Sequence, residues 1–440
     1  MATQLSRTAS STTDAQRKTW TLSFWLKPSN MSGSSAQEYH YVYQASGGSS
    51  GYFRMDSDQK LRYRDYTNGG SPDYLRITNR VFRDPSAWYH IVLRNDTTQS
   101  TAADRIRLYV NGELQEWSNA NQPAQDHVGF INSTFPYQIG QSGSNGLDST
   151  YLAQYIMCAG QSYAPTVFGS TNANGIWIPN SQPSVTYGTN GFKLDFTGTG
   201  ASADASGFGA DSSGNGNHFA SSNLGTNPST TDQCINNFAT YNAVDTSSNI
   251  ALSKGNTVAT ANSNHSASRA SMGLTSGKWY WENKIDSVSG GPAVGVMAAS
   301  APLANQLNAN PSRFYRNNGE KYENGSGSSY GATFTTGDII GVALDMDNGA
   351  LYFYKNGTIQ NSGTAAFTDM ITAMSPVTNS PSPWLPAVKL YSEAVSINFG
   401  NPSYTIASSN ADANGYGNFE YAVPSGYYAL CTKNLGAYGG

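Results

Sequence analysis

Two stretches of this 440-residue chain repeat one short pattern, an alternating aromatic and aliphatic run that ends in Asn-Gly. They are LYVNGE at residues 108–113 and LYFYKNG at residues 351–357. Alternation with a period of two is typical of a half-buried β-strand. Asn-Gly supplies two residues that accept positive φ, as a tight type I′ hairpin turn requires. Each stretch therefore predicts a β-hairpin, and their wide separation predicts two all-β domains.

The segments around both hairpins are also typical of β-structure. They are short, rich in aromatic residues and separated by Gly, Ser and Asn, and we find no amphipathic helix of any length. The first region contains TWTLSFWLKP (19–28), EYHYVYQA (38–45), YFRMD (52–56), KLRYRDY (60–66) and AWYHIVLRN (87–95); the last contains KWYWENKI (278–285), AVGVMA (293–298), DIIGVALDMD (338–347) and VSINFG (395–400). We predict two antiparallel β-sandwiches.

Changes in composition divide the chain into four predicted parts. The sandwiches are placed at residues 1–160 and 231–402. Residues 161–230 are rich in Gly, Asn, Ser and Thr and include the strand-like GFKLDF, so we expect a connecting segment with short strands that packs on one or both sandwiches. Residues 403–440 end in FEYAVPSGYYALCT, and we expect this tail to return strands to the second sandwich.

Charge and targeting signals exclude several classes of partner. Charged residues make up 12% of the chain, the formal net charge is −4 and no Lys/Arg run is present. We therefore expect neither nucleic-acid binding nor membrane insertion. No apolar run is long enough for a transmembrane helix, and the first residues lack a signal-peptide core, so we expect synthesis in a cytoplasm. The three cysteines are far apart, which argues against a disulfide framework.

The strand motifs resemble two related families. TWTLSFWLKP, AWYHIVLRNDTT and DRIRLYVNGE resemble the laminin-G/concanavalin A-like lectin fold over roughly residues 1–160. SGKWYWENKI, GDIIGVALDMDNGALYFYKNG, WLPAVKLY and INFG, in this order over roughly 231–402, resemble a SPRY (B30.2-like) domain. SPRY is itself a concanavalin-like bent sandwich, which would explain why the hairpin pattern occurs twice.

A third resemblance covers nearly the whole chain. SRTASSTTDAQRKTWTLSFWLK, YGTNGFKLDF, DSSGNGNHF and GYYALCTKNL resemble segments of virion and tail-fibre-like proteins of tailed phages, particularly marine and cyanobacterial ones. This resemblance implies a structural protein located in the virion. The chain shows no heptads or shaft repeats, so a head-decorating or tail-attached module stays open beside a tail fibre.

Catalytic motifs are weak. G-x-S-x-G strings occur at residues 47–51 and 327–331, but neither follows the strand-to-helix pattern of a nucleophile elbow. We find no E-x-D-x-x-E string with the paired carboxylates of a glycosidase, and the five histidines are scattered. Asp345 and Asp347 precede Asn-Gly, so a hairpin turn explains them better. We therefore expect no enzymatic activity.

Residues 211–217, DSSGNGN, resemble the start of a calcium loop. Oxygen-bearing side chains occur at alternate positions, with Gly sixth, in Asp211, Ser213, Asn215 and Asn217. The twelfth position is Ser222 where a bidentate Glu is expected. The sequence thus leaves two interpretations open, a structural calcium site or a turn cluster that satisfies its own polar groups.

Candidate glycan- or partner-binding residues combine tyrosine rings with polar neighbours in turn-rich segments. They are Tyr63, Tyr66, Asn68 and Tyr74 in the first domain and Tyr315, Arg316, Tyr322 and Tyr330 in the second. The chain contains 28 tyrosines, so many of them must be ordinary strand-surface residues or subunit contacts.

These observations predict a non-enzymatic structural protein of a tailed-phage virion that displays lectin-like domains to glycans of the host surface. The expected partners are other virion proteins, host-surface polysaccharide and further copies of the chain, and the expected homo-oligomer is a trimer. The alternatives are an architectural capsid-decoration or tail component that contacts only virion proteins, a polysaccharide depolymerase and a secreted bacterial adhesin.

Overall fold

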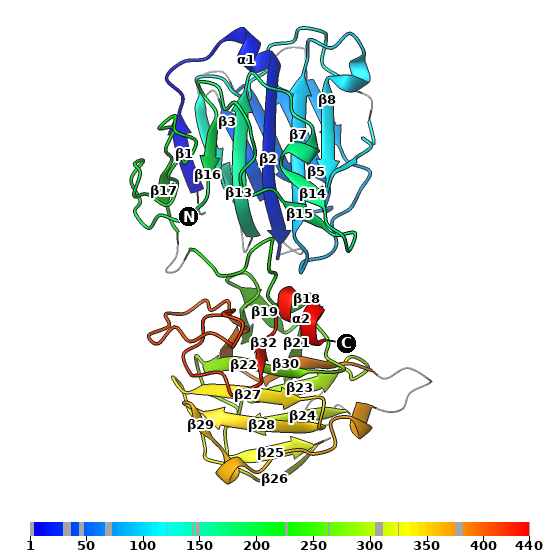
Figure 1. The fold of residues 1–440 in the computed structure, drawn as a ribbon, viewed down its shortest axis with the longest axis vertical. Coiled ribbons are helices and arrows are strands. Elements are labelled where there is room, and N and C mark those ends of the chain that lie inside the picture. Colours follow the sequence, from blue (N-terminus) through cyan, green and yellow to red (C-terminus); the bar gives the residue numbers. More distant parts are fainter. Residues whose placement is uncertain are drawn as a thin grey trace. The chain divides into compact units, whose positions relative to one another are not determined.

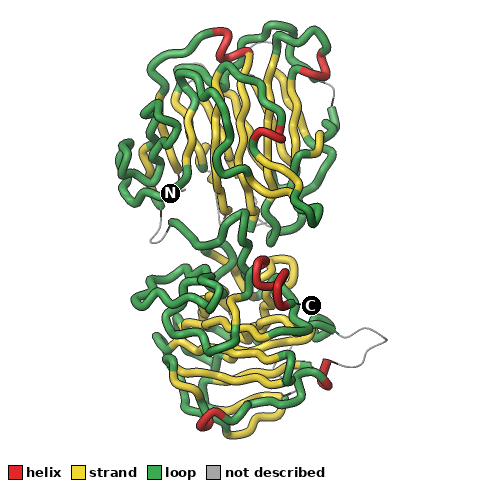
Figure 2. Tube along the Cα trace, in the orientation of Figure 1, coloured by secondary structure: helices red, strands yellow, loops and turns green. Residues whose placement is uncertain are grey.

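The computed structural model describes residues 4–29, 37–43, 48–66, 73–119, 121–142, 145–146, 150–224, 228–262, 265–303, 311–323, 325–374 and 382–439. The chain forms two compact units, Met1–Ser229 and Thr230–Gly440, and each is considered by itself. Strands dominate both units, and the helices among the described residues are short (Figures 1 and 2). The predicted fold class, all-β with two antiparallel β-sandwiches, is confirmed.

In its described part, the first unit contains a seven-stranded and a six-stranded antiparallel sheet. The seven-stranded sheet has the order β17 (Ala220–Ser222), β1 (Gln4–Thr8), β10 (Pro136–Ile139), β3 (Gln37–Tyr43), β4 (Ser50–Met55), β5 (Leu61–Tyr66) and β6 (Asp73–Ile77). The six-stranded sheet has the order β16 (Phe192–Leu194), β13 (Thr150–Ala159), β2 (Thr19–Pro28), β7 (Tyr89–Asp96), β8 (Ile106–Val110) and β9 (Glu113–Leu114). Additional elements are α1 (Asp14–Lys18) and the strand pairs β11 (Gln141–Ser142) with β12 (Asn145–Gly146) and β14 (Gly169–Thr171) with β15 (Trp177–Pro179).

The second unit repeats this plan within its own described residues, with a seven-stranded and an eight-stranded sheet. The first sheet has the order β18 (Tyr241–Thr246), β21 (Ser266–Ala270), β30 (Trp384–Leu390), β23 (Ala293–Ala298), β24 (Ser312–Arg316), β25 (Glu320–Glu323) and β26 (Ser326–Ser329). The second has the order β19 (Ile250–Ser253), β20 (Val258–Ala261), β31 (Ala394–Asn398), β22 (Lys278–Ile285), β27 (Ile339–Asp345), β28 (Ala350–Lys355) and β29 (Thr358–Ile359), with β32 (Tyr428–Ala429) parallel to β22. A helix, α2 (Thr432–Tyr438), follows β32.

Each unit has its main core between its two sheets. In β8, Ile106, Leu108 and Val110 are fully buried and alternate with partly exposed residues, as the period of two predicts. Every residue of β27 in the second unit is buried, because both faces of that strand are covered. The alternation therefore marks the strands that have one covered face.

The segment that follows each sandwich completes the unit to which it is attached. After the first sandwich, β16 pairs with β13 and β17 pairs with β1. After the second, the buried carboxylate of Glu282 accepts hydrogen bonds from the backbone N–H groups of Glu420 (3.0 Å) and Tyr421 (2.8 Å). Burial raises the pKa of Glu282, whereas these two hydrogen bonds act in the opposite direction.

The two Asn-Gly turns are built in the same way. Asn111 and Asn356 have φ values of 51° and 48°, in the left-handed region. The amide oxygen of Asn111 accepts a hydrogen bond from the backbone N–H of His90 at 2.8 Å, and that of Asn356 accepts one from Ile339 at 2.9 Å. Each turn therefore satisfies a backbone donor at the start of a neighbouring strand.

The glycine of each turn lies against an aromatic ring from the segment that follows the sandwich. A Cβ atom at Gly112 would lie 2.5 Å from a ring carbon of Trp177, and one at Gly357 would lie 2.6 Å from a ring carbon of Tyr421. Both glycines also have positive φ, 82° and 78°. The hairpin pattern occurs twice because each turn must bend tightly and also receive a ring at close contact.

We expect Gly357→Ala to destabilise the second unit by roughly 2–4 kcal/mol, because it adds a clash with Tyr421 to the strain of positive φ. Gly337→Ala is the matched control, since Gly337 has φ of 92° but a Cβ atom there would have no neighbouring atom within 4 Å. That control should lose only about 1 kcal/mol. Urea unfolding measures both losses, and equal losses would contradict a packing role for the Tyr421 ring.

Candidate functional site

The described residues of the first unit contain one serine–histidine pair that resembles part of a hydrolase site. Ser23 and His90 are 2% and 1% exposed, and Ser23 Oγ lies 3.0 Å from His90 Nε2. On the other side of the imidazole, Trp177 Nε1 donates a hydrogen bond to His90 Nδ1 at 2.9 Å. Trp25 stacks on the same ring with centroids 4.9 Å apart.

The Trp177 hydrogen bond decides what this pair can do. Because His90 Nδ1 accepts from an indole N–H, the proton of the neutral imidazole is on Nε2, which donates to Ser23 Oγ. A general base would have to accept the serine proton at that same Nε2 atom. Burial also lowers the pKa of His90 to about 3. This arrangement joins the segment containing Trp177 to the sheet and does not activate Ser23.

We expect this histidine to make the first unit sensitive to acid. Its pKa falls from 6.5 to about 3 on folding, so the unfolded chain binds more protons between these values and stability falls as the pH falls through that window. Replacing His90 by Gln should flatten the dependence by up to about 1.4 kcal/mol per pH unit. Urea unfolding at about pH 7 and about pH 4.5 tests this, with His265→Gln in the second unit as the control. Equal acid losses in the wild type and His90→Gln would refute the expectation.

The candidate residues of the first unit lie in different environments. Tyr63 is buried in the core with its ring 6.2 Å from that of Trp20, a placement that does not favour surface binding. Tyr66 lies on the more exposed face of β5, where the guanidinium carbon of Arg64 is 4.4 Å from the centre of its ring. Tyr74 is partly buried against His127, at 4.8 Å between ring centres. Asn68 lies outside the described residues.

The candidates of the second unit divide in the same way. Tyr315 and Tyr330 are buried in the core with ring centres 5.6 Å apart. Arg316 and Tyr322 are partly exposed on neighbouring strands, and Arg316 Nη1 donates to the Tyr322 hydroxyl at 3.1 Å. The guanidinium carbon lies 5.5 Å from the Tyr322 ring centre. The structure therefore brings two of the four candidates together and places the other two in the core.

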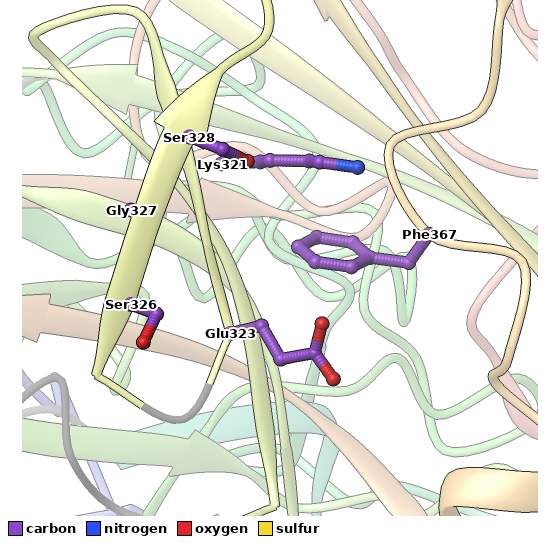
Figure 3. A pocket seen from close by; sticks show the side chains of 6 residues that line it. All are labelled: Lys321, Glu323, Ser326, Gly327, Ser328 and Phe367. Carbon is purple, nitrogen blue, oxygen red and sulfur yellow. The ribbon is translucent and has the colours of Figure 1, made fainter.

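A shallow hollow of about 380 Å³ lies on the other face of β25, beside the edge strand β26. Figure 3 shows the side chains of Lys321, Glu323 and Phe367 pointing into it, and Ser326, Gly327 and Ser328 complete its lining. Lys321 and Glu323 already have protein partners, the Ala366 carbonyl and Arg313, respectively. The second G-x-S-x-G string lies along β26 and the residues after it, without the strand-to-helix turn of a nucleophile elbow.

The loop with the calcium-like pattern is organised by its aspartate. Asp211 Oδ1 accepts from the backbone N–H groups of Lys193 and Ser213, each at 2.9 Å. Its Oδ2 accepts from Ser213 Oγ (2.9 Å) and from the Asn217 N–H (2.8 Å). The side-chain amides of Asn215 and Asn217 donate to backbone carbonyls, including that of Gly191. These contacts favour the interpretation as a turn cluster, because the carboxylate already has four donors.

The same arrangement occurs in the second unit at residues 412–418, which share the spacing D-x-x-G-x-G-N with residues 211–217. Asp412 Oδ1 accepts from the backbone N–H groups of Asn414 and Tyr416, each at 2.9 Å. Its Oδ2 accepts from the Ala429 N–H at 3.0 Å and from the Asn434 amide at 2.7 Å. The pattern thus specifies a loop that an aspartate can close without a metal ion.

We expect calcium and a calcium chelator to leave the thermal unfolding midpoint of the first unit unchanged, because backbone and side-chain donors satisfy Asp211. Asp211→Ala should destabilise this unit by roughly 2–4 kcal/mol, since one buried and three partly buried donors lose their acceptor. Differential scanning calorimetry with calcium and with EGTA measures both effects, and Asp204→Ala, in an exposed turn, is the control. A midpoint that rises with calcium in the wild type and not in Asp211→Ala would restore the metal interpretation.

Two other kinds of site are absent from the described residues. No group of three or more His, Cys, Asp or Glu side chains there is arranged to hold a metal ion. Nor does that part of the chain contain a helix with the length and apolar character needed to cross a membrane.

Sequence reasoning missed two buried groups, His90 and Lys389. Lys389 lies in β30, in the otherwise uncharged segment WLPAVKL, and is only 5% exposed. Burial lowers its pKa to about 7. The sequence feature that could have identified Lys389 is its place as the single charged residue of an apolar strand, because a lysine there needs a partner or a special environment.

Comparisons with known proteins agree with this architecture. A family model for the SPRY domain matches residues 278–402, and one for the concanavalin A-like lectin/glucanases superfamily matches residues 3–155. The chain therefore contains both kinds of domain, and the predicted resemblance to these two families is confirmed. Each matched region lies within one of the two units.

Several curated relatives match part of the chain. Ran-binding protein 9 of Danio rerio is 31% identical over 129 residues, which are 28% of this chain and 20% of the relative. Ran-binding protein 10 of Danio rerio is 30% identical over 133 residues, 29% of this chain and 20% of the relative. The chain spans about a fifth of the length of these relatives. Both are eukaryotic proteins, so a phage origin stays a prediction.

Solved structures of SPRY domains are also similar. The SPRY domain of human HERC1 has 24% sequence identity and a TM-score of 0.28, and the match covers 38% of this chain and 99% of that one. A second human SPRY domain has 22% identity and a TM-score of 0.27, with 34% and 94% covered.

Proposed function

We propose that this chain is a non-enzymatic structural protein of a tailed-phage virion whose sandwiches bind glycans of the host surface. The observation that carries the binding role is the pairing of an arginine with a partly exposed tyrosine in each unit, Arg64 with Tyr66 and Arg316 with Tyr322. A guanidinium over a ring holds the ring in one orientation and adds hydrogen-bond donors beside its apolar face. Sugars are bound by this combination of a flat apolar surface and polar groups at its edge.

The location in a virion is supported by the resemblance of segments along the chain to virion and tail-fibre-like proteins. Many copies on one particle would convert weak contacts into strong attachment. A symmetric homo-oligomer, with a trimer as the specific form, would supply that copy number together with contacts to other virion proteins. Synthesis in the host cytoplasm before assembly completes this proposal.

A second candidate function is architectural, with the SPRY-like unit contacting another virion protein. Two relatives that match part of this chain are named Ran-binding proteins, a name that indicates a binding partner for those proteins. In that case the Arg316–Tyr322 pair would lie in a contact between subunits.

Retention of the purified chain on immobilised host polysaccharides tests the binding role. Tyr66→Ala and Tyr322→Ala should each weaken retention by about tenfold, because each removes one stacking ring. Tyr438→Ala, which removes a 38% exposed ring elsewhere, is the control. Unchanged retention of both variants would refute a binding role for these two tyrosines. Release of reducing ends from the polysaccharide would favour a depolymerase.

Immunoelectron microscopy of intact particles, with an antibody to the second unit, tests the location. Label at the distal tail supports host attachment. Label over the capsid, together with no retention on any glycan, would favour the architectural candidate. Absence of label from particles that contain all their structural proteins would overturn the virion assignment.

A further inference from the structure

A buried lysine and a partly exposed arginine share the outer face of the seven-stranded sheet in the second unit. In β30, Val388 and Leu390 belong to the core between the sheets, so Lys389 lies on the opposite face. In β24, Tyr315 belongs to that core, and Arg316 therefore also lies on the outer face. Among the described residues, neither Lys389 Nζ nor Arg316 Nε has a hydrogen-bond partner, although both atoms are buried.

Strand register places these two residues on either side of one small residue. Ala293 in β23 pairs with Lys389 on one side and with Arg316 on the other. Neighbouring strands are about 4.8 Å apart, so the two backbones are separated by about 10 Å. At this point of the face, β23 contributes only the small residues Ala293 and Gly295.

Both cations lean toward one pair of rings. Lys389 reaches across β23, and its Nζ lies 5.4 Å from the ring centre of Phe314 in β24. The Arg316 guanidinium lies over the ring of Tyr322, at 5.5 Å. Phe314 and Tyr322 are paired across β24 and β25, so the two cationic groups lie near adjacent rings.

A third cation on the same face shows how a buried arginine is normally satisfied. Arg269 forms two hydrogen bonds of 2.7 Å with the Asp245 carboxylate and donates to the carbonyls of Ala298 and Ala301. Lys389 and Arg316 have no such carboxylate among the described residues. Burial is the sole cause of the lowered pKa of Lys389, and no neighbouring acid counteracts it. Donors buried without an acceptor are costly, and a bound anion would remove that cost.

We propose that Lys389 and Arg316 form a binding site for an anionic substituent of a sugar, with Phe314 and Tyr322 as its wall. The anion, a carboxylate or a phosphate, would accept from Lys389 Nζ and Arg316 Nε, and the sugar ring would contact the partly exposed Tyr322. The assignment of the ligand to an acidic sugar of a host polysaccharide rests on the proposed function. The anion site itself depends only on the two unpartnered donors and the register between them.

Isothermal titration of the full chain with polygalacturonate, phosphorylated dextran and unmodified dextran tests the site and separates the two anion sources. Lys389→Met and Arg316→Gln should each weaken the binding of an anionic polymer by at least about tenfold. Lys254→Met, which removes an exposed lysine with the same charge, should leave the affinity unchanged. Lys389→Met replaces a buried cation by an apolar side chain, so its melting temperature at neutral pH should equal or exceed that of the wild type, which separates lost binding from lost folding.

Two outcomes would overturn the proposal in different ways. Anionic polymers that bind equally to the wild type, Lys389→Met and Arg316→Gln would refute the site and leave the glycan-binding function standing. If none of the three polymers binds, the site is decided by thermal shift with glucuronate, inorganic phosphate and glucose, and the glycan-binding function by retention on host polysaccharides. Stabilisation of the wild type by either anion, absent in Lys389→Met, supports the site; no stabilisation of the wild type refutes it.

Discussion

The close approach of an aromatic ring to a turn glycine is the contact on which both units depend. Trp177 lies on Gly112 and Tyr421 on Gly357, and each ring belongs to the segment that follows the sandwich. Each turn also fixes a strand, because its asparagine accepts a backbone N–H from the neighbouring strand. Sandwich and following segment therefore also meet at this turn, where a side chain on the glycine would clash with the ring.

Buried carboxylates strengthen the same connection. Asp211 and Asp412 each accept four hydrogen bonds within loops of the same spacing, and Glu282 binds two backbone donors of the C-terminal tail. Only 12% of the residues are charged, so stability relies on polar groups with complete sets of partners more than on surface ion pairs. Lys389 Nζ and Arg316 Nε are buried donors without such partners among the described residues, and the proposed anion site rests on them.

The two-residue period of a β-strand is enough to place several of the candidate residues on opposite faces of their strands. Tyr63 and Tyr66 are three positions apart on one strand, so they lie on opposite faces, and the same is true of the adjacent Tyr315 and Arg316. Period alone does not say which face is covered. Tyr330 follows β26 and is buried by residues distant in sequence, such as Phe353, which no local pattern indicates. The meaning of DSSGNGN was likewise open, because calcium loops and aspartate-closed turns use the same oxygen spacing.

Local sequence thus determined the strands, the two hairpin turns and the all-β class, because alternation and positive φ are properties of neighbouring residues. It also identified Arg316 and Tyr322 as candidates. Only the tertiary structure decided that Trp177 fixes the tautomer of His90 and that Lys389 faces Arg316 across Ala293. Those relations depend on strand order and register, which are set by contacts between residues far apart in the chain.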